Sequence, residues 1–278
     1  MQIKAAMRYI LNPIAFAEEV LGFTPDDWQR EIMLSASKRM LLNCCRQSGK
    51  STTTAIIALH RALFWANSKI LLVSPSQKQS SELFRKVMGF YRLIPNMPKP
   101  EEENKLSLEL RNGSRIISLP SNEDTIRGYS AVSILIEDEA SRVSDELYKA
   151  VRPMLAVSGG RLVLLSTPHG ETGHFYNEWH GDSNWLRMKI TANDCPRISK
   201  EFLEEERQSL GDAWFKSEYM GEFIPDNNQL FSRSIIEAAF SNSINSFSFL
   251  DDRVPASQNL AGEISKRAIS NNVQLIKI

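Results

Sequence analysis

Three residues near position 50 have the side chains and the spacing that a nucleotide-phosphate loop requires. Gly49, Lys50 and Ser51 follow an apolar run that ends at Cys44. Gly49 permits close approach of a phosphate, Lys50 supplies a cation for β- and γ-phosphates, and the Ser51 hydroxyl can ligate Mg²⁺. Backbone N–H groups of the loop would surround the phosphate oxygens. The pattern therefore predicts a site for nucleotide phosphates and Mg²⁺.

The loop departs from the usual pattern at its first position. Glycine is expected five residues before Gly49, and Cys44 stands there. The context still favours a phosphate loop, because residues 40–44 are typical of a buried strand and residues 52–66 of a helix with one apolar stripe. A turn without nucleotide chemistry is the alternative for Gly-Lys-Ser taken alone.

A second group of residues can supply a metal site and a catalytic carboxylate. Residues 134–136 predict an apolar strand, and three consecutive acids follow, Glu137, Asp138 and Glu139. Successive strand residues face opposite ways, so the three carboxylates cannot serve one site equally. We assign Asp138 to Mg²⁺ and Glu139 to orienting and polarising the attacking water, as phosphoryl transfer requires. A solvated strand end is the alternative.

Three further residues have side chains suited to nucleotide chemistry. Gln29 offers a donor and an acceptor, which suits the N6 and N7 edge of adenine, although an ordinary surface glutamine is the alternative. Arg127 lies in a glycine-containing loop, as an arginine finger offered to a neighbouring subunit would, or else it forms a surface salt bridge. Thr167 follows a strand predicted at residues 161–166, where a polar residue can touch the γ-phosphate or the lytic water. Alone, Thr167 is weak evidence, because proline after a strand is otherwise just a turn.

The elements that must position these residues alternate between strands and helices. Residues 69–74 form another near-continuous apolar run, as in strands covered on both faces, and Ser76 caps the helix that follows. Residues 107–110 and 115–119 flank Asn112-Gly113, which predicts a hairpin. Strands that alternate with helices, with one hairpin added, predict an α/β fold with a mostly parallel sheet flanked by helices.

Two helical segments are predicted before the phosphate loop. Residues 1–22 have a helical apolar pattern that Pro13 interrupts or restarts. Thr24 then offers a hydroxyl cap, with Pro25 at the first helical position and acids in the first turn. The second helix is therefore predicted to start at Pro25 and to contain Gln29.

Composition limits the class of protein. With 278 residues and 42% hydrophobic content, the chain can form one large domain, alone or with a small appendage. Its 33 basic and 33 acidic residues give zero formal charge, which implies no general polyanion-binding surface and neither supports nor excludes DNA. Three cysteines and four histidines show neither a disulfide framework nor metal-ligand spacing. We expect a soluble cytoplasmic protein without signal peptide or membrane helix.

The order of these pieces resembles the large terminase subunit of tailed bacteriophages. The resemblance covers roughly residues 10–232 and rests on Phe16 to Gln29, Arg46 to Ser51, Ile136 to Ala140, Ser166 to Pro168 and Glu218 to Phe223. Members of that family are ATP-driven motors that push viral DNA into a preformed capsid, with a RecA-like P-loop core and a small lid subdomain. The family tolerates a residue other than glycine at the position of Cys44.

The resemblance implies a nucleotide-binding and metal-binding set. The residues implied to bind ATP are Gln29, Arg46, Gln47, Ser48, Gly49, Lys50 and Ser51. Within this set, Gln29 is the adenine contact and Arg46 a phosphate-sensing arginine. Ser51 and Asp138 are the residues implied on the Mg²⁺ side.

The resemblance also implies catalytic roles. Glu139 corresponds to the catalytic carboxylate, and Thr167 lies in the motif that couples hydrolysis to the rest of the protein. Arg46 and Arg127 are the arginines implied to act on the phosphates, Arg127 in the place of the family's proposed trans-acting finger.

The expected organisation is a RecA-like ATPase core over residues 1–190, a lid subdomain over 191–228, and a linker helix with a weakly ordered tail over 229–278. Large terminases usually continue into an RNase H-like nuclease domain, whose two metal ions need several converging carboxylates. About 50 residues follow Pro225, too few for such a fold. We therefore expect no DNA cleavage by this chain.

The expected function is that of the ATP-hydrolysing motor domain of a phage terminase. Its expected partners are double-stranded DNA, a portal protein, the small terminase subunit and further copies of itself in a ring, in the bacterial host cytoplasm and transiently on the procapsid. One alternative is a helicase-like DNA translocase, which would typically carry a second RecA-like half. The other is a catalytically silent prophage remnant, against which the retention of Lys50, Asp138 and Glu139 speaks.

Overall fold

The computed structural model describes residues 3–120, 126 and 128–225. These residues fall in the first of two compact units, Met1–Leu230. The second unit, Phe231–Ile278, lies outside the described residues, and so do Arg127 and the whole of the predicted linker helix and tail at 229–278.

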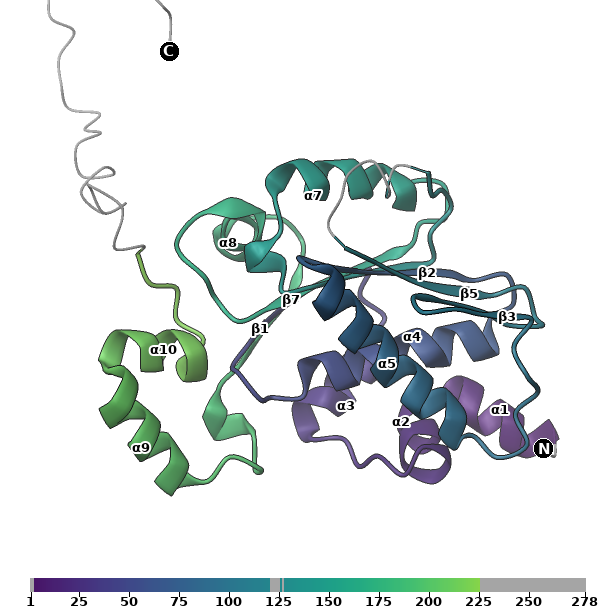
Figure 1. The fold of residues 1–278 in the computed structure, drawn as a ribbon, viewed down its shortest axis with the longest axis horizontal. Helices are drawn as coiled ribbons and strands as arrows, with labels where there is room; N and C mark the ends of the chain where they lie inside the picture. Colours follow the sequence, from purple (N-terminus) through teal and green to yellow (C-terminus); the bar gives the residue numbers. More distant parts are fainter. Residues whose placement is uncertain (1–2, 121–125, 127, 226–278) are drawn as a thin grey trace, which may run out of the picture. The chain divides into compact units, whose positions relative to one another are not determined.

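The described residues form an eight-stranded sheet with the order β3-β4-β5-β2-β6-β7-β1-β8 (Figure 1). The strands are β1 (Arg39–Cys44), β2 (Lys69–Ser74), β3 (Glu102–Glu103), β4 (Ser107–Glu109), β5 (Arg115–Pro120), β6 (Ile134–Asp138), β7 (Arg161–Ser166) and β8 (Leu186–Ile190). All neighbours from β5 to β8 pair in parallel, whereas β3, β4 and β5 pair antiparallel. The mostly parallel sheet and its added hairpin are therefore confirmed.

Helices cover both faces of the sheet. The helices are α1 (Ile3–Leu11), α2 (Pro13–Ala15), α3 (Asp27–Leu34), α4 (Lys50–Phe64), α5 (Gln77–Leu93), α7 (Asp145–Val151), α8 (Gly173–His180), α9 (Lys200–Leu210) and α10 (Asp212–Met220). A π-helical turn, η1 (Phe16–Val20), and three 3₁₀ turns, η2 (Ala140–Arg142), η3 (Arg152–Leu155) and η4 (Ala192–Asp194), join them. Figure 1 shows α3, α4 and α5 on one face and α7 and α8 on the other.

Alternate residues of the inner strands pack into two separate cores. Met40 and Leu42 of β1 belong to the same core as Ile56 of α4. Leu41 points the other way and belongs to the core that contains Phe175 of α8. Both faces of the strand are therefore buried, which is why its sequence is continuously apolar rather than alternating. Each fully buried large side chain of this kind stabilises the fold by about 1.5–3 kcal/mol.

The predicted start of the second helical segment was wrong by two residues. α3 begins at Asp27, not at Pro25, and Asp26 is its N-cap. The Asp26 N–H donates to Gln29 Oε1 at 2.9 Å, so a capping box formed by Asp26 and Gln29 replaces the predicted threonine cap. The predicted interruption at Pro13 is confirmed, because α1 ends at Leu11 and α2 starts at Pro13.

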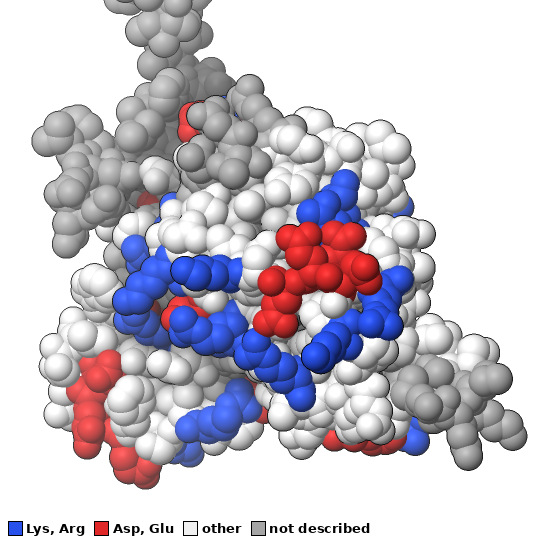
Figure 2. Space-filling view, turned by 45° about the vertical axis from the view of Figure 1, so that its right-hand side comes forward, with Lys and Arg blue, Asp and Glu red and all other residues white. Residues whose placement is uncertain are grey.

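Charges of both signs share the surface. Figure 2 shows Lys and Arg side chains bordering a cluster of Asp and Glu on the face turned to the viewer. Arg92 donates to Glu103 at 2.7 Å and Arg115 lies 3.1 Å from Glu109, so these two cations near β3 and β4 are already paired. In the described part of the chain, no helix has the length and apolar character needed to cross a membrane.

Candidate functional site

The phosphate-loop residues, the acids and Thr167, which were predicted to take part in nucleotide chemistry, meet where three neighbouring strands end. β6, β7 and β1 are adjacent and parallel, so their carboxyl ends lie at one edge of the sheet. The phosphate-loop residues follow β1, the acids end β6, and Thr167 follows β7. This edge of a parallel sheet is where α/β proteins typically bind ligands.

The loop between β1 and α4 has a backbone suited to phosphate. Gln47 and Gly49 both have positive φ, 61° and 90°, a conformation that glycine adopts at little cost. Closely spaced left-handed residues turn successive backbone N–H groups toward one point. α4 begins directly after Gly49 and is 15 residues long, so the positive end of its dipole faces the loop. The loop can therefore cradle an anion.

Ser51 and Asp138 form the metal side of the site. The Ser51 hydroxyl donates to Asp138 Oδ2 at 3.0 Å. Burial raises the pKa of Asp138, and the nearby Lys50 ammonium opposes this shift. Among the described residues, no group of three or more His, Cys, Asp and Glu side chains could hold a metal alone. A hydroxyl and one carboxylate fit Mg²⁺, which is usually bound through one or two carboxylates together with substrate phosphates.

Lys50 and Glu139 form an ion pair beside this metal side. Lys50 Nζ lies 3.0 Å from Glu139 Oε1 and donates to Thr167 Oγ1 at 3.4 Å. Burial disfavours the charged amine, but the carboxylates of Glu139 and Asp138 outweigh burial, so the pKa of Lys50 is raised. Lys50 is thus a fixed cation in contact with residues from the loops after β6 and β7.

The backbone at Glu139 brings a second carboxylate into the same site. Glu139 has φ 57° and ψ 44°, a left-handed conformation that is costly for a residue with a side chain. The turn places Glu139 beside Lys50, although a regular strand would separate it from Asp138. Glu137 faces elsewhere, as the alternation of a strand predicts: it is fully buried, and its Oε1 lies 2.7 Å from His174 Nε2.

Ser166 and Ser141 hold the strand ends around Glu139. Ser166 Oγ donates to Glu139 Oε2 at 3.4 Å and lies 2.6 Å from Ser141 Oγ. The Ser141 hydroxyl also contacts the Thr167 carbonyl at 2.8 Å. Ser166 belongs to a motif that carries the family resemblance, but the sequence predicted no role for its hydroxyl or for that of Ser141, because serines at strand ends have no distinctive local pattern.

Gln29 lies next to the loop, and the oxygen of its side-chain amide is already engaged in a hydrogen bond. Its side chain is completely buried, and Oε1 accepts the Asp26 N–H in the capping box. Nε2 has no hydrogen-bond partner within the described residues. A Cβ on Gly49 would lie only 3.0 Å from this Nε2. The structure thus leaves the donor of Gln29 free beside the phosphate loop and engages its acceptor.

Arg197 is a residue that the sequence did not indicate. Its guanidinium makes two hydrogen bonds to the Asp26 carboxylate, at 2.7 and 2.6 Å, and a third to the Ser48 carbonyl at 3.1 Å. Arg197 thereby joins the segment before α9 to the cap of α3 and to the phosphate loop. No local signal could have found it, since its partners lie more than 140 positions away.

Arg46 connects the loop to α10. Its N–H donates to the Glu218 carbonyl at 2.7 Å, and its Nε lies 3.7 Å from Glu218 Oε2. The Arg46 side chain is 65% exposed, whereas that of Glu218 is 9% exposed, so the arginine is free to move toward a ligand. The position of Arg127 lies outside the described residues.

Comparison with known proteins finds a matching family and several relatives. Residues 41–238 match the family described as terminase large subunit, T4likevirus-type, N-terminal. The chain is similar to the terminase large subunit of Escherichia phage T5, at 24% identity over 237 residues, covering 81% of this chain and 53% of that protein. This chain thus spans about half the length of the curated relatives it matches.

Solved structures share the fold. The large terminase ATPase domain of Thermus phage P74-26 superposes with a TM-score of 0.67 at 23% identity, covering 77% of this chain and all of that one. The large terminase of another thermophilic bacteriophage, in complex with ATP-gamma-S, superposes with a TM-score of 0.57 at 13% identity, covering 72% of this chain and 53% of that one.

Proposed function

The chain belongs to the T4-like terminase large-subunit family, with the fold of the large terminase ATPase domain, and on that premise we propose that it hydrolyses ATP to drive DNA packaging. The observation that carries the proposal is the meeting of two pairs at one sheet edge, Ser51 with Asp138 and Lys50 with Glu139. A phosphate loop opposite an acidic strand end is the arrangement that phosphoryl transfer needs.

In this proposal the nucleotide phosphates lie on the loop from Arg46 to Ser51, at the N-terminus of α4. Ser51 and Asp138 would hold Mg²⁺, which when bound neutralises charge on the β- and γ-phosphates. The second thermophilic-phage terminase, solved with ADP and with ATP-gamma-S, supports a nucleotide as the ligand of this fold. The unpartnered Nε2 of Gln29 supports an adenine contact at the same end of the site.

Lys50 and Glu139 would change partners when the nucleotide binds. In the structure, Lys50 is paired directly with Glu139. A bound γ-phosphate competes for the Lys50 ammonium and leaves the Glu139 carboxylate to orient a water and accept its proton. Thr167 and Ser166 contact Lys50 and Glu139, so the loop after β7 is placed to sense that change.

We also propose the division into a core over 1–190 and a lid over 191–228. In support, α9 has no buried residue, whereas α10 carries Phe215 and Tyr219 into the core beside the phosphate loop. Arg46 contacts Glu218 of α10, so movement of Arg46 toward phosphate would act on that helix.

We also propose the partners of this chain, which spans about half the length of its curated relatives. The proposed partners are double-stranded DNA, the portal protein, the small terminase subunit and further copies of the chain in a ring on the procapsid. Arg127, outside the described residues, is proposed as the finger offered to a neighbour in that ring, a role worth roughly 10³–10⁵ in rate.

The test is Mg²⁺-dependent ATP hydrolysis over a series of protein concentrations. Glu139→Gln should lower turnover at least about 100-fold, the usual contribution of a positioned acid or base. Glu146→Gln is the matched control, since Glu146 is exposed and lies in the first turn of α7. Turnover that rises with concentration and is lost in Arg127→Ala would support the ring. A parent without hydrolysis at any concentration, or an active Glu139→Gln, would overturn the assignment.

A further inference from the structure

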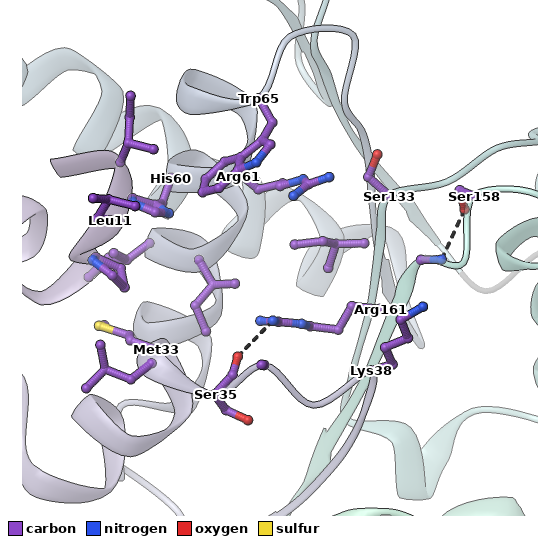
Figure 3. A pocket seen from close by; sticks show the side chains of 18 of the residues that line it. Leu11, Met33, Ser35, Lys38, His60, Arg61, Trp65, Ser133, Ser158 and Arg161 are labelled. Atoms are coloured by element: carbon purple, nitrogen blue, oxygen red, sulfur yellow. Dashed lines mark hydrogen bonds between the residues drawn. The ribbon is translucent and has the colours of Figure 1, made fainter. Parts of the chain in front are cut away.

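A cavity lies at the amino ends of β1, β6 and β7, at the opposite edge of the sheet from the phosphate loop (Figure 3). Its volume is about 510 Å³. It is lined by Lys38, Ser133 and Arg161, which stand just before or at the first residues of β1, β6 and β7. The same three strands carry the nucleotide site at their other ends. The cavity is therefore separate from that site.

Cationic side chains line the cavity on both its strand side and its helical side. Lys38, Arg61 and Arg161 line it, and no Asp or Glu of the described residues does. Arg161 donates to the Ser35 carbonyl at 2.8 Å, and the Arg61 guanidinium lies over the Trp65 ring at 4.9 Å from its centroid. The Nε of Arg61 is buried without a hydrogen-bond partner within the described chain. Strong donors thus remain unused.

The two arginines also act on one another. Burial lowers the pKa of Arg61, and burial together with the nearby Arg61 charge lowers the pKa of Arg161. Two partly buried guanidinium groups without an acid between them are unfavourable. An anion placed in the cavity would be attracted by both and would reduce that repulsion.

The helical side of the cavity also carries apolar side chains that are open to solvent. Leu11 is 76% exposed, Leu34 58% and Trp65 37%, although all three are large apolar side chains. Figure 3 shows Leu11, Met33 and Trp65 on the helical side, across from Lys38 and Ser158 on the strand side. Single exposed apolar residues need no explanation, but several around one cavity are typical of a binding surface.

We propose that this cavity binds a short segment of a partner protein in which a carboxylate side chain stands next to an apolar residue. The arginine forks match a carboxylate in two-point hydrogen bonds, and the apolar rim matches the neighbouring side chain. Arg and Trp are the residues that most often dominate protein interfaces, and the volume lies in the range of ligand cavities. A phosphate, free or in DNA, would satisfy the cations and leave the rim in water.

The test follows the indole N–H signal of Trp65 in ¹H–¹⁵N correlation spectra. The chain has five tryptophans, and the Trp65 signal is the one missing from Trp65→Phe. The probe is the blocked tripeptide Leu-Asp-Leu, and its matched controls are Leu-Asn-Leu and Ser-Asp-Ser. Leu-Asp-Leu should move the signal, and both controls should bind roughly tenfold more weakly or worse, because one lacks the charge and the other the apolar contacts.

Variants locate the effect in the cavity. Arg61→Gln should weaken Leu-Asp-Leu binding by roughly tenfold to a hundredfold, the effect of a lost charged hydrogen-bond donor. Arg85→Gln is the control, because Arg85 is an exposed arginine of α5 paired with Glu82. If Arg61→Gln fails to fold, Lys38→Ala serves instead, since Lys38 lines the cavity on the strand side, away from the helix that carries Arg61.

Three results would overturn the proposal. The first is a Trp65 signal that no tripeptide moves at millimolar concentration. The second is equal binding of Leu-Asp-Leu by the parent and by the folded cavity variants. The third is inorganic pyrophosphate or a short DNA duplex moving the signal more than Leu-Asp-Leu does, which would make the ligand a phosphate. ATP hydrolysis is measured in parallel, and since its site lies at the other sheet edge, failure of either proposal leaves the other standing.

Discussion

Replacement of His174 is predicted to make the stability of this protein strongly dependent on pH. The His174 ring is 4% exposed and contacts the Oε1 of the fully buried Glu137 at 2.7 Å. On the other side, Nδ1 lies 3.2 Å from Asp145, and the Tyr148 ring stacks on the imidazole at 4.3 Å. Replacement by Phe keeps an aromatic ring against Tyr148 but removes the partner of Glu137.

The size of the effect follows from what the buried carboxyl can do. Burial raises the pKa of Glu137 from its ordinary value of 4.5, and His174 opposes that shift. Without His174, the carboxyl would take up a proton rather than stay charged and unpaired. At 1.36 kcal/mol per pH unit, protonation costs about 3.4 kcal/mol at pH 7 and about 0.7 kcal/mol at pH 5.

The sign of the pH dependence is therefore fixed. A folded state that holds a proton more tightly than the unfolded chain loses stability as pH rises above the unfolded pKa. The free energy of unfolding of His174→Phe should therefore fall by up to about 2.7 kcal/mol between pH 5 and pH 7, which is the difference between the two costs of protonating Glu137. Urea unfolding at both pH values measures the difference.

A double variant separates the carboxyl from the packing change. His174→Phe with Glu137→Gln has the same ring in the same place but no ionisable group at position 137. Because it lacks both ionisable side chains, its own free energy of unfolding should change far less between pH 5 and pH 7 than that of His174→Phe. If the single variant is equally independent of pH, Glu137 does not depend on His174 and the reasoning is refuted.

The other predictions concern separate parts of the unit. Gly49→Ala should lower the free energy of unfolding by about 1–2 kcal/mol, because φ is +90° and the new Cβ would meet Gln29 Nε2 at 3.0 Å; unchanged urea unfolding would contradict this. Leu72→Ala should lower the free energy of unfolding by about 2–5 kcal/mol, because Leu72 is a fully buried residue of β2. Leu34→Ala should lower it far less, because Leu34 is 58% exposed. Equal losses in the two variants would contradict the different burial of these residues. Arg197→Ala should cost less than about 1 kcal/mol in thermal unfolding, because its side chain is 51% exposed in the ion pair with Asp26.

Local sequence patterns were sufficient to predict most of the helices and strands. β2 and β7 lie at residues 69–74 and 161–166, as their apolar runs predicted, and the hairpin closes around Asn112-Gly113. The phosphate loop joins β1 to α4 where Gly-Lys-Ser indicated. Such elements depend on the preferences of neighbouring residues, which is why a single sequence reveals them. The helix start at Asp27 was missed because Asp26 and Gln29 formed a capping box that competed with Thr24 and Pro25.

Which side chains meet in the site depends on the order of the strands in the sheet. The sequence indicated that Ser51, Asp138 and Thr167 each end or follow an element, but it contained no information on which strands are neighbours. Placing β7 between β6 and β1 brings Lys50 within reach of both Glu139 and Thr167. The roles of these residues in catalysis stay predictions until hydrolysis is measured.

Sequence patterns thus determined the elements, the phosphate loop and the family resemblance, because these are properties of short stretches and their order. Only the tertiary structure decided that His174 pairs with Glu137, that Arg197 reaches the phosphate loop, and that Arg61 and Arg161 share a cavity without an acid among the described residues. These contacts join residues that are far apart in the chain. Their formation depends on the packing of whole strands and helices, and no neighbouring residue carries a signal for it.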